Sequence, residues 1–146
     1  MAKKPTPKKV SAPAKTAGAT NAIPRSFGIV VKHSVDTAAD LAISTALWLQ
    51  KRNCEVWIAD EAKTVRKKNP KLPVAPKEEL PVKCDMILVF GGDGTFLSIA
   101  RQMIWKSVPI LGVNMGQLGF LTETRADEVI ETLENVLKGK YKLQEH

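Results

Sequence analysis

The chain has 146 residues, of which 44% are hydrophobic, 25% charged and 5% aromatic, and this composition fits one globular domain. No apolar run approaches the ~20 residues that span a bilayer, and the N-terminus lacks the apolar core of a secretory signal, so we expect no membrane contact. Two cysteines, Cys54 and Cys84, are too few for a disulfide framework or a CxxC metal site. This cysteine usage favours a reduced compartment, the cytoplasm.

The net charge of +7 is distributed unevenly along the chain. Residues 1–25 contain six basic and no acidic side chains, whereas the rest of the chain carries 16 basic and 15 acidic ones. A nucleic-acid-binding domain is expected to carry positive charge on its fold, so the near neutrality of the rest argues against nucleic acid as a partner. Residues 1–25 also hold almost no large apolar side chains. We therefore predict a disordered basic tail, either a solubilising extension or a weak contact for an anionic partner.

Ordered structure is predicted to begin at residue 26. Residues 27–31 form a short β-branched run, typical of a buried strand. Asp36 is a suitable first residue for a helix whose alanines recur at helical spacing through about Gln50, and residues 54–59 indicate a second strand. In residues 60–83, which are rich in Pro and Lys, we predict a short polar helix over 61–68. An irregular, mobile surface segment follows, because four prolines forbid a long helix.

The second half of the chain continues the alternation of strands and helices. Residues 85–90 are apolar at every position, typical of a strand buried on both faces of a parallel sheet. A helix over 96–105 and a strand over 109–113 complete a unit with the length of a βαβ crossover. Thr124 to Asp127 has the spacing of a capping box, ahead of an apolar helical stripe from Val129 to Leu137. Residues 141–143 indicate a further strand, so the predicted fold class is α/β, with a Rossmann-like open parallel sheet and flanking helices.

The segment Gly91-Gly92-Asp93-Gly94-Thr95 lies between a buried strand and a helix. Glycines let the backbone approach a ligand closely, and the N–H groups at a helix start favour phosphate oxygens. The negative charge of Asp93 would repel phosphate at this helix start unless the side chain has a task of its own. It could hold a divalent cation that bridges phosphates, or it could accept a proton from a substrate hydroxyl. Either role fits phosphoryl transfer, and the carboxyl end of a parallel strand is where open α/β sheets bind ligands. The alternative is a plain strand-to-helix turn, for which the same residues are good turn chemistry.

GGDGTFLSIAR at residues 91–101, followed by PILGVNMGQLGFLTE at residues 109–123, closely resembles the N-terminal half of the NAD kinases. The resemblance implies transfer of the ATP γ-phosphate to the 2′-hydroxyl of the adenosine ribose of NAD, giving NADP. It also implies a divalent cation, with magnesium the expected ion and Asp93 a possible ligand. The implied roles are proton acceptor for Asp93, NAD contacts for Asp93, Gly94, Ser98 and Phe120, and ATP or phosphate contacts for Gly91, Gly92, Gly94 and Thr95.

Family members have a second, mostly β domain after this point, with an Asn-Glu or Asn-Asp pair that binds the dinucleotide. We therefore expect residues 26–143 to be the N-terminal domain of a two-domain kinase. Residues 144–146 are then the start of the C-terminal β domain, which is absent here. On this reading the chain lacks catalytic power alone, and the full-length protein is a homo-oligomer. Diacylglycerol and sphingosine kinases and phosphofructokinases have related loops, so a lipid kinase domain and a non-catalytic nucleotide-binding module stay as alternatives. The lipid kinases follow the loop with a Gly-Thr-Gly-Asn-Asp-type segment, which this sequence lacks.

Several other residues have two interpretations. Phe120 packs either against the dinucleotide or in the core. Arg101, two helical turns past Asp93, either reaches a phosphate or forms a surface ion pair. His33 follows a strand end and has no partner pattern. The basic run Arg66, Lys67, Lys68 and Lys71 is expected to be a solvated face, with phosphate binding as the second interpretation.

Overall fold

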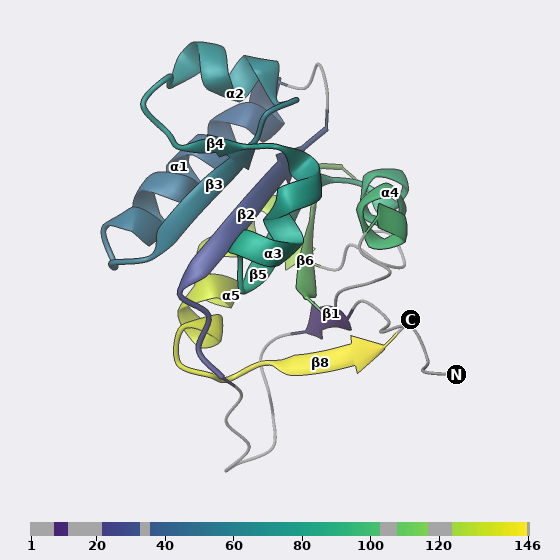
Figure 1. Ribbon diagram of the computed structural model, residues 1–146. Helices are drawn as coiled ribbons and strands as arrows, with labels where there is room; N and C mark the ends of the chain where they lie inside the picture. Colours follow the sequence, from purple (N-terminus) through teal and green to yellow (C-terminus); the bar gives the residue numbers. More distant parts are fainter. Residues whose placement is uncertain (1–7, 12–21, 33–35, 103–107, 117–123, 146) are drawn as a thin grey trace.

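A single β-sheet organises the chain, and helices cover both of its faces (Figure 1). The computed structural model describes residues 8–11, 22–32, 36–102, 108–116 and 124–145. The strands are β1 Lys8–Ser11, β2 Ser26–Val31, β3 Glu55–Ala59, β4 Val74–Ala75, β5 Met86–Gly91, β6 Pro109–Asn114, β7 Thr124–Arg125 and β8 Lys142–Glu145. The helices are α1 Asp36–Gln50, α2 Lys63–Lys68, α3 Leu80–Lys83, α4 Asp93–Gln102 and α5 Val129–Val136, with 3₁₀ turns η1 Lys77–Glu79 and η2 Ala126–Glu128. Within these ranges no helix combines the length and apolarity needed to cross a bilayer.

The strand order is β4-β3-β2-β5-β6-β1-β8, with β7 paired to β6. All the pairings are parallel except the antiparallel pairing of β1 with β8. From β2 the chain first adds β3 and β4 on one side, then returns to place β5 on the other side of β2. The order of strands therefore reverses between β2 and β5. In open α/β sheets the crevice at such a switch point, outside the carboxyl ends of the strands, is where ligands bind.

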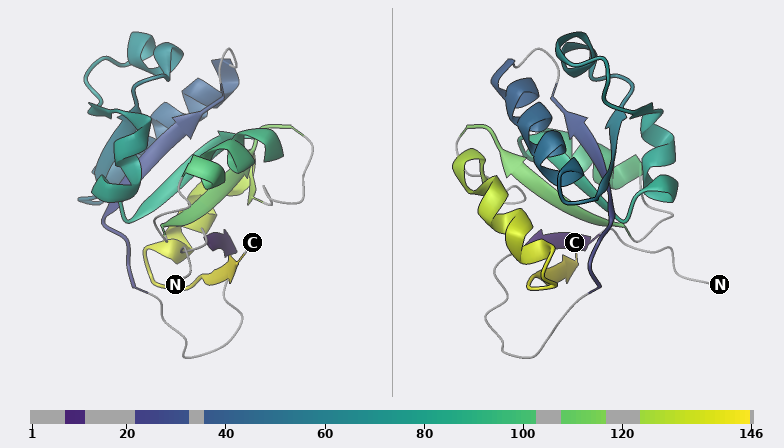
Figure 2. Two further views of the ribbon diagram at one scale, coloured as in Figure 1. Left: turned by 45° about the vertical axis from the view of Figure 1, so that its right-hand side comes forward. Right: turned by 90° about the vertical axis from the view of Figure 1, so that its left-hand side faces the viewer.

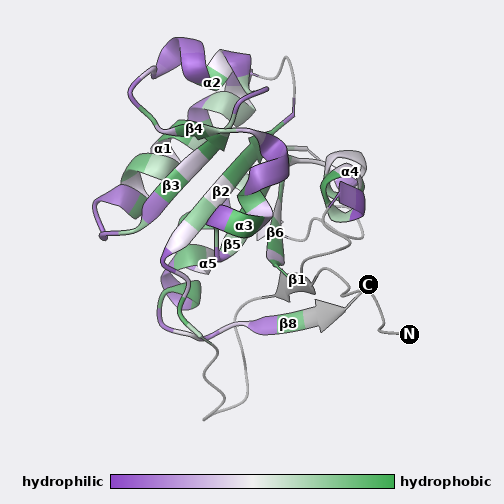
Figure 3. Ribbon diagram, viewed as in Figure 1, coloured by the Kyte–Doolittle hydropathy of each residue, from purple (hydrophilic) through white to green (hydrophobic). Residues whose placement is uncertain are grey.

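The core has two layers, one on each face of the sheet. In β5, Met86, Leu88 and Phe90 pack in the layer beneath α1 and α5, whereas Ile87 and Val89 pack in the layer beneath α3 and α4. The right-hand view in Figure 2 shows α1 and α5 on one side of the sheet and α3 on the other. Figure 3 shows the central strands as mainly hydrophobic and α2 as mainly hydrophilic. Burial on both faces explains why β5 is apolar at every position, and the α/β prediction is confirmed.

The amino ends of β2 and β5 are joined by a reciprocal pair of side chains. The Asp85 carboxylate accepts hydrogen bonds from the backbone N–H groups of Arg25, at 2.9 Å, and Ser26, at 3.3 Å. The Ser26 hydroxyl oxygen in turn accepts one from the Asp85 N–H at 2.9 Å. These contacts help to fix the register of the two strands and thus the position of their carboxyl ends.

Residues 60–83 contain more regular structure than the predicted irregular segment, and the short polar helix predicted over 61–68 is present as α2. This part of the chain forms α2, β4, η1 and α3, and β4 extends the sheet as a parallel partner of β3. Leu72, Ala75 and Leu80 are buried in the core layers. The prolines do exclude a long helix, but tertiary burial stabilises short elements that local sequence preferences alone do not.

Three further sequence expectations need correction. Residues 8–11, inside the predicted disordered tail, form β1 between β6 and β8, because pairing of the backbone does not depend on large apolar side chains. The strand predicted at 141–143 extends to Glu145 as β8, across the expected boundary at residue 143. The capping box predicted at Thr124 and Asp127 is formed one residue later, by Arg125 and Glu128. The Glu128 carboxylate accepts a hydrogen bond from the Arg125 N–H at 3.2 Å.

Candidate functional site

The carboxyl ends of three adjacent strands, β2, β5 and β6, converge at one edge of the sheet. The Lys32 N–H, just past β2, donates to the Phe90 carbonyl at 2.9 Å. On the other side of β5, Gly91 is in register with Asn114, and the Met115 N–H donates to the Gly91 carbonyl at 3.1 Å. The GGDGT segment therefore lies between the end of β2 and the end of β6, beside the switch point.

The GGDGT segment is the end of a strand and the first turn of a helix. Gly91 is the last residue of β5, and α4 begins at Asp93, three residues before the predicted start at Phe96. The Phe96 N–H donates to the Gly92 carbonyl at 3.0 Å, which closes the first helical turn. The predicted site residues Asp93, Gly94, Thr95 and Ser98 thus all lie in the first two turns of α4, at the end of the helix where the dipole favours anions.

The fold explains the presence of glycine at only one of the three glycine positions in this segment. Gly91 is buried, and a Cβ placed on it would lie 2.8 Å from Thr95 Oγ1 and 3.3 Å from Lys32 Cβ. The packing of Thr95 and Lys32 therefore requires a glycine at position 91. A Cβ on Gly92 or Gly94 would meet nothing within 4 Å, and neither residue has a positive φ. The described part of the fold thus gives no steric reason for glycine at these two positions.

An open cavity of about 270 Å³ lies at the switch point, and we call it the switch-point cavity. It is lined by the end of β2 and Lys32, by Gly94, Thr95 and Ser98 of α4, and by Glu61 and Lys77. Lys77 Nζ and a Glu61 carboxylate oxygen form an ion pair at 3.1 Å, and both side chains are half-buried. Gly94 and Ser98 are exposed and Thr95 is half-buried, so all three are within reach of a ligand in the cavity.

Asp93 is half-buried at the first position of α4 and is not among the residues that line the switch-point cavity. Within the described ranges no three His, Cys, Asp or Glu side chains gather as a metal site. Proteins usually hold Mg²⁺ through one or two carboxylates together with substrate phosphates. A single carboxylate at a helix start that suits phosphate oxygens fits that donor set, and Asp93 is the carboxylate at this position.

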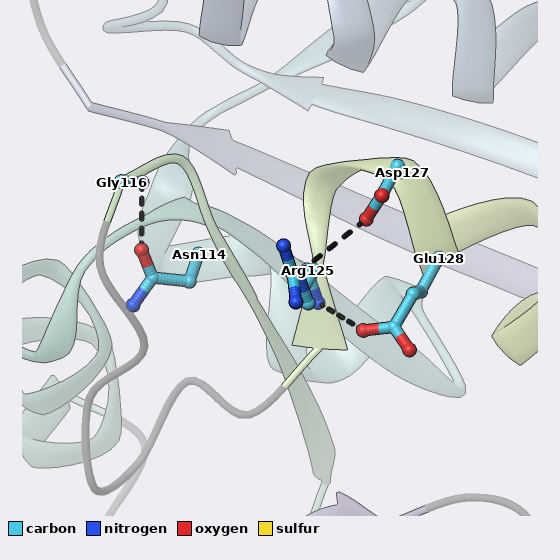
Figure 4. A network of polar contacts seen from close by, with 5 residues as sticks. All are labelled: Asn114, Gly116, Arg125, Asp127 and Glu128. Atoms are coloured by element: carbon cyan, nitrogen blue, oxygen red, sulfur yellow. Dashed lines mark hydrogen bonds and ion pairs between the residues drawn. The ribbon is translucent and has the colours of Figure 1, made fainter.

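The end of β6 is shaped by an Asn side chain. Asn114 is buried, and its Oδ1 accepts a hydrogen bond from the Gly116 N–H at 2.7 Å, which turns the chain directly beside Gly91 (Figure 4). The description of the chain resumes at Thr124. Arg125 Nε lies 3.7 Å from the Asp127 carboxylate, and the Arg125 backbone N–H donates a hydrogen bond to the Glu128 carboxylate. Phe120, predicted to contact the dinucleotide, lies outside the described residues.

The remaining candidates are distributed over the fold. Arg101 is exposed on α4 and forms no ion pair with another described residue, so the expected surface ion pair is not observed there. His33 lies outside the described residues. Lys68 pairs with Asp40 at 2.8 Å, in agreement with a solvated basic face on α2. Cys54 and Cys84 are free and buried, and burial raises the pKa of both thiols, that of Cys84 to about 12, as expected for small core residues.

Sequence reasoning missed Lys32, Glu61 and Lys77 as residues near the site. Lys32 follows β2 as directly as Gly92 follows β5, so alignment of the carboxyl ends of the two strands was the signal that could have identified it. No comparable signal existed for Glu61 and Lys77. They reach the cavity only because residues 60–83 fold back over the sheet edge.

Known proteins resemble this chain in both sequence and fold. Residues 27–141 match the family described as the ATP-NAD kinase N-terminal domain. An NAD kinase of Magnetococcus marinus is 39% identical over 121 residues, which cover 82% of this chain and 40% of that protein. An NAD kinase of Syntrophotalea carbinolica is 40% identical over 119 residues, which cover 82% of this chain and 41% of that protein.

A solved structure extends the likeness to the fold. The crystal structure of yeast NADH kinase complexed with NADH has a TM-score of 0.69 and 16% sequence identity, over 96% of this chain and 48% of that chain. The chain thus spans about 40% of the length of the curated relatives that it matches and about half of the yeast protein.

Proposed function

Since the chain belongs to the NAD kinase family, we propose that it forms the nucleotide-binding half of an enzyme that transfers the γ-phosphate of ATP to NAD. The acceptor is the 2′-hydroxyl of the adenosine ribose, and the product is NADP. Because the chain spans about 40% of its relatives' length, we expect turnover from a protein of the family's full length and only binding from this chain. We also propose that the full-length enzyme is a cytoplasmic homo-oligomer.

The observation that carries this proposal is the pair of glycines without a steric role in the fold. Gly94 lies in the first turn of α4 with open space where a Cβ would stand. Glycine inside a helix costs about 1 kcal/mol relative to alanine, so the fold alone favours alanine at this position. A ligand that approaches the backbone closely at the helix start supplies the missing reason, and phosphate is the ligand that such a turn binds best.

Each residue of the segment has a separate task in the proposed reaction. Asp93 accepts the proton of the ribose hydroxyl as that oxygen attacks the γ-phosphorus of ATP, while the bond from this phosphorus to the β,γ-bridging oxygen breaks and ADP leaves. The backbone of Gly92 and Gly94 and the Thr95 hydroxyl hold phosphate oxygens, while Gly91 shapes the turn beneath Thr95. Ser98, one helical turn past Gly94, and Phe120 contact the dinucleotide. A divalent cation held by Asp93 and the phosphates would supply charge neutralisation.

Two measurements test the proposal. Isothermal titration of the chain with NAD, ATP and a glycerolipid head-group analogue identifies the ligand class, and we expect NAD and ATP to bind. A coupled assay of NADP formation on the family-length protein then tests the chemistry, with Asp93→Asn as the variant. We expect that variant to lose at least about 100-fold in kcat while it keeps its fold and NAD affinity. Binding of the lipid analogue alone would support a lipid kinase, and binding of nucleotides without turnover would support a non-catalytic module.

A further inference from the structure

A second open cavity lies beside α2 and the start of β4, and we call it the basic hollow. It has a volume of about 370 Å³ and is lined by Lys63, Arg66, Lys67, Pro70 and Val74. None of these residues lines the switch-point cavity. Figure 1 shows α2 beside β4, the last strand at one end of the sheet order, whereas the GGDGT segment follows the central strand β5. The basic hollow is therefore separate from the site of the proposed reaction.

The three cations of the basic hollow lie on one face of one helix. Lys63, Arg66 and Lys67 have the i, i+3 and i+4 spacing that places side chains next to one another along a helix. All three residues are exposed, and none of them forms an ion pair with a carboxylate of another described residue. Like charges at this spacing repel one another and destabilise the helix. The helix therefore carries a repulsion that a bound anion would relieve.

The neighbouring contacts leave these cations to a ligand. Lys68, the next residue of the same basic run, pairs with Asp40 of α1 at 2.8 Å and does not line the basic hollow, so its charge is used to hold α2 against α1. Arg66 Nη1 donates a hydrogen bond to the Asp60 carbonyl at 3.0 Å. This bond restrains the guanidinium group and uses only one of its five N–H donors. Arg66 is thus held in place for the paired contacts that a guanidinium group makes with phosphate oxygens.

The charge and the size of the basic hollow favour a compact anion with several charges. A single exposed ion pair changes an affinity by about 5-fold or less, so an anion with one charge would be held weakly. Two or more phosphate groups can contact all three cations at once, and their contributions then combine. The volume of about 370 Å³ falls within the ~300–1,000 Å³ typical of small-molecule pockets. Pro70 and Val74 add an apolar wall against which the rest of such a ligand can pack.

We propose that the basic hollow binds a small anion that carries two or more phosphate groups, with Lys63, Arg66 and Lys67 as its cationic ligands. This site goes beyond the proposed function, since it shares no residue with the GGDGT segment. The ligand chemistry is a chain of linked phosphates, whether part of a nucleotide or a free inorganic chain. A nucleic acid is disfavoured, because the chain after residue 25 carries 16 basic and 15 acidic side chains and is nearly neutral.

The test is titration of the isotopically labelled chain with inorganic tripolyphosphate and, separately, with ADP, at an ionic strength of about 0.15 M. NMR chemical shifts locate the binding, and wild type is compared with the double variant Arg66→Ala, Lys67→Ala. We expect saturable shifts at residues 63–74, and we expect the double variant to weaken this binding by about 10-fold or more. Tighter binding of ADP would indicate a nucleotide as the ligand, and tighter binding of tripolyphosphate an inorganic chain. Both replaced residues are exposed, so the variant should fold, and thermal unfolding checks this.

The matched control is the double variant Lys51→Ala, Lys140→Ala, which removes the same charge from two exposed positions outside the basic hollow. A second control, Gly94→Ala, changes the GGDGT segment and should leave the shifts at residues 63–74 as they are in wild type. The proposal is overturned if neither ligand gives saturable shifts at residues 63–74, or if the matched control weakens the binding there equally. It is also overturned if Gly94→Ala abolishes those shifts, or if a short DNA duplex binds there more tightly than both ligands.

Discussion

Gly91 lies directly beneath Thr95, so closely that a Cβ on the glycine would stand 2.8 Å from Thr95 Oγ1 and 3.1 Å from Thr95 Cβ. The end of β5 and the first turn of α4 are therefore packed against one another without space for one more methyl group. This contact sets the direction in which the helix leaves the sheet and, with it, the position of the GGDGT segment.

Gly91→Ala should destabilise the protein by about 1–3 kcal/mol, because the added methyl group must displace Thr95 or Lys32. Urea unfolding followed by circular dichroism measures the change. Gly92→Ala is the comparison, since a Cβ there meets nothing within 4 Å, and replacing a glycine at the helix N-cap by alanine should cost less than about 1 kcal/mol. Equal stabilities of the two variants would show that the contact between Gly91 and Thr95 does not constrain the turn.

Thr45→Val should stabilise the protein by about 0.5–1.5 kcal/mol. Thr45 is fully buried in α1, and its Oγ1 has no hydrogen-bond partner among the described residues. Valine has nearly the same shape and a similar helix propensity, and it removes the cost of burying an unpaired hydroxyl. Thermal unfolding provides the measurement, with the exposed neighbour Ser44→Val as control. A clear loss of stability in Thr45→Val would mean that the hydroxyl is satisfied in solution.

The Cys84 thiol should make stability depend on alkaline pH. Burial, with smaller contributions from Glu55 and Asp85, raises its pKa from 9.0 to about 12, so the folded state keeps the proton that the unfolded state releases. Its contribution to the free energy of unfolding is fully present below pH 9.0 and decreases as pH rises from there toward 12. Urea unfolding between about pH 8 and 11 should show this decline, and Cys84→Ala should make it shallower. Burial raises the pKa of Cys54 and Tyr141 as well, so part of the decline should persist. Identical pH profiles for wild type and Cys84→Ala would contradict the account.

The elements that sequence patterns predict well are those whose pattern and burial agree. The bounds of α1 match the prediction at both Asp36 and Gln50, because its alanines recur on the face that packs on the sheet. The strand β5 was predicted to within one residue, since burial on both faces leaves an apolar run. The GGDGT motif was predicted to follow a buried strand and to precede a helix, and it lies at the end of β5 and the start of α4.

The features that sequence reasoning missed depend on contacts between distant segments. The helix α4 begins at Asp93, where the Phe96 N–H donates to the Gly92 carbonyl, whereas the pattern alone treats three glycines as a loop. Glu61 and Lys77 reach the cavity through the fold of a proline-rich segment whose short elements have little stability of their own. Lys32 directly follows β2, and its position beside the GGDGT segment depends on β2 and β5 being neighbours in the sheet.

The central claim is that a bound nucleotide, and not the fold, requires glycine at position 94. The most direct measurement is the NAD affinity of Gly94→Ala by isothermal titration, together with its stability by urea unfolding. Ser44→Ala on α1, which improves helix propensity away from the site, serves as the control. We predict that Gly94→Ala is as stable as wild type or up to about 1 kcal/mol more stable, and that its NAD affinity falls by about 10-fold or more while Ser44→Ala binds normally. Wild-type NAD affinity in a correctly folded Gly94→Ala variant would contradict the claim.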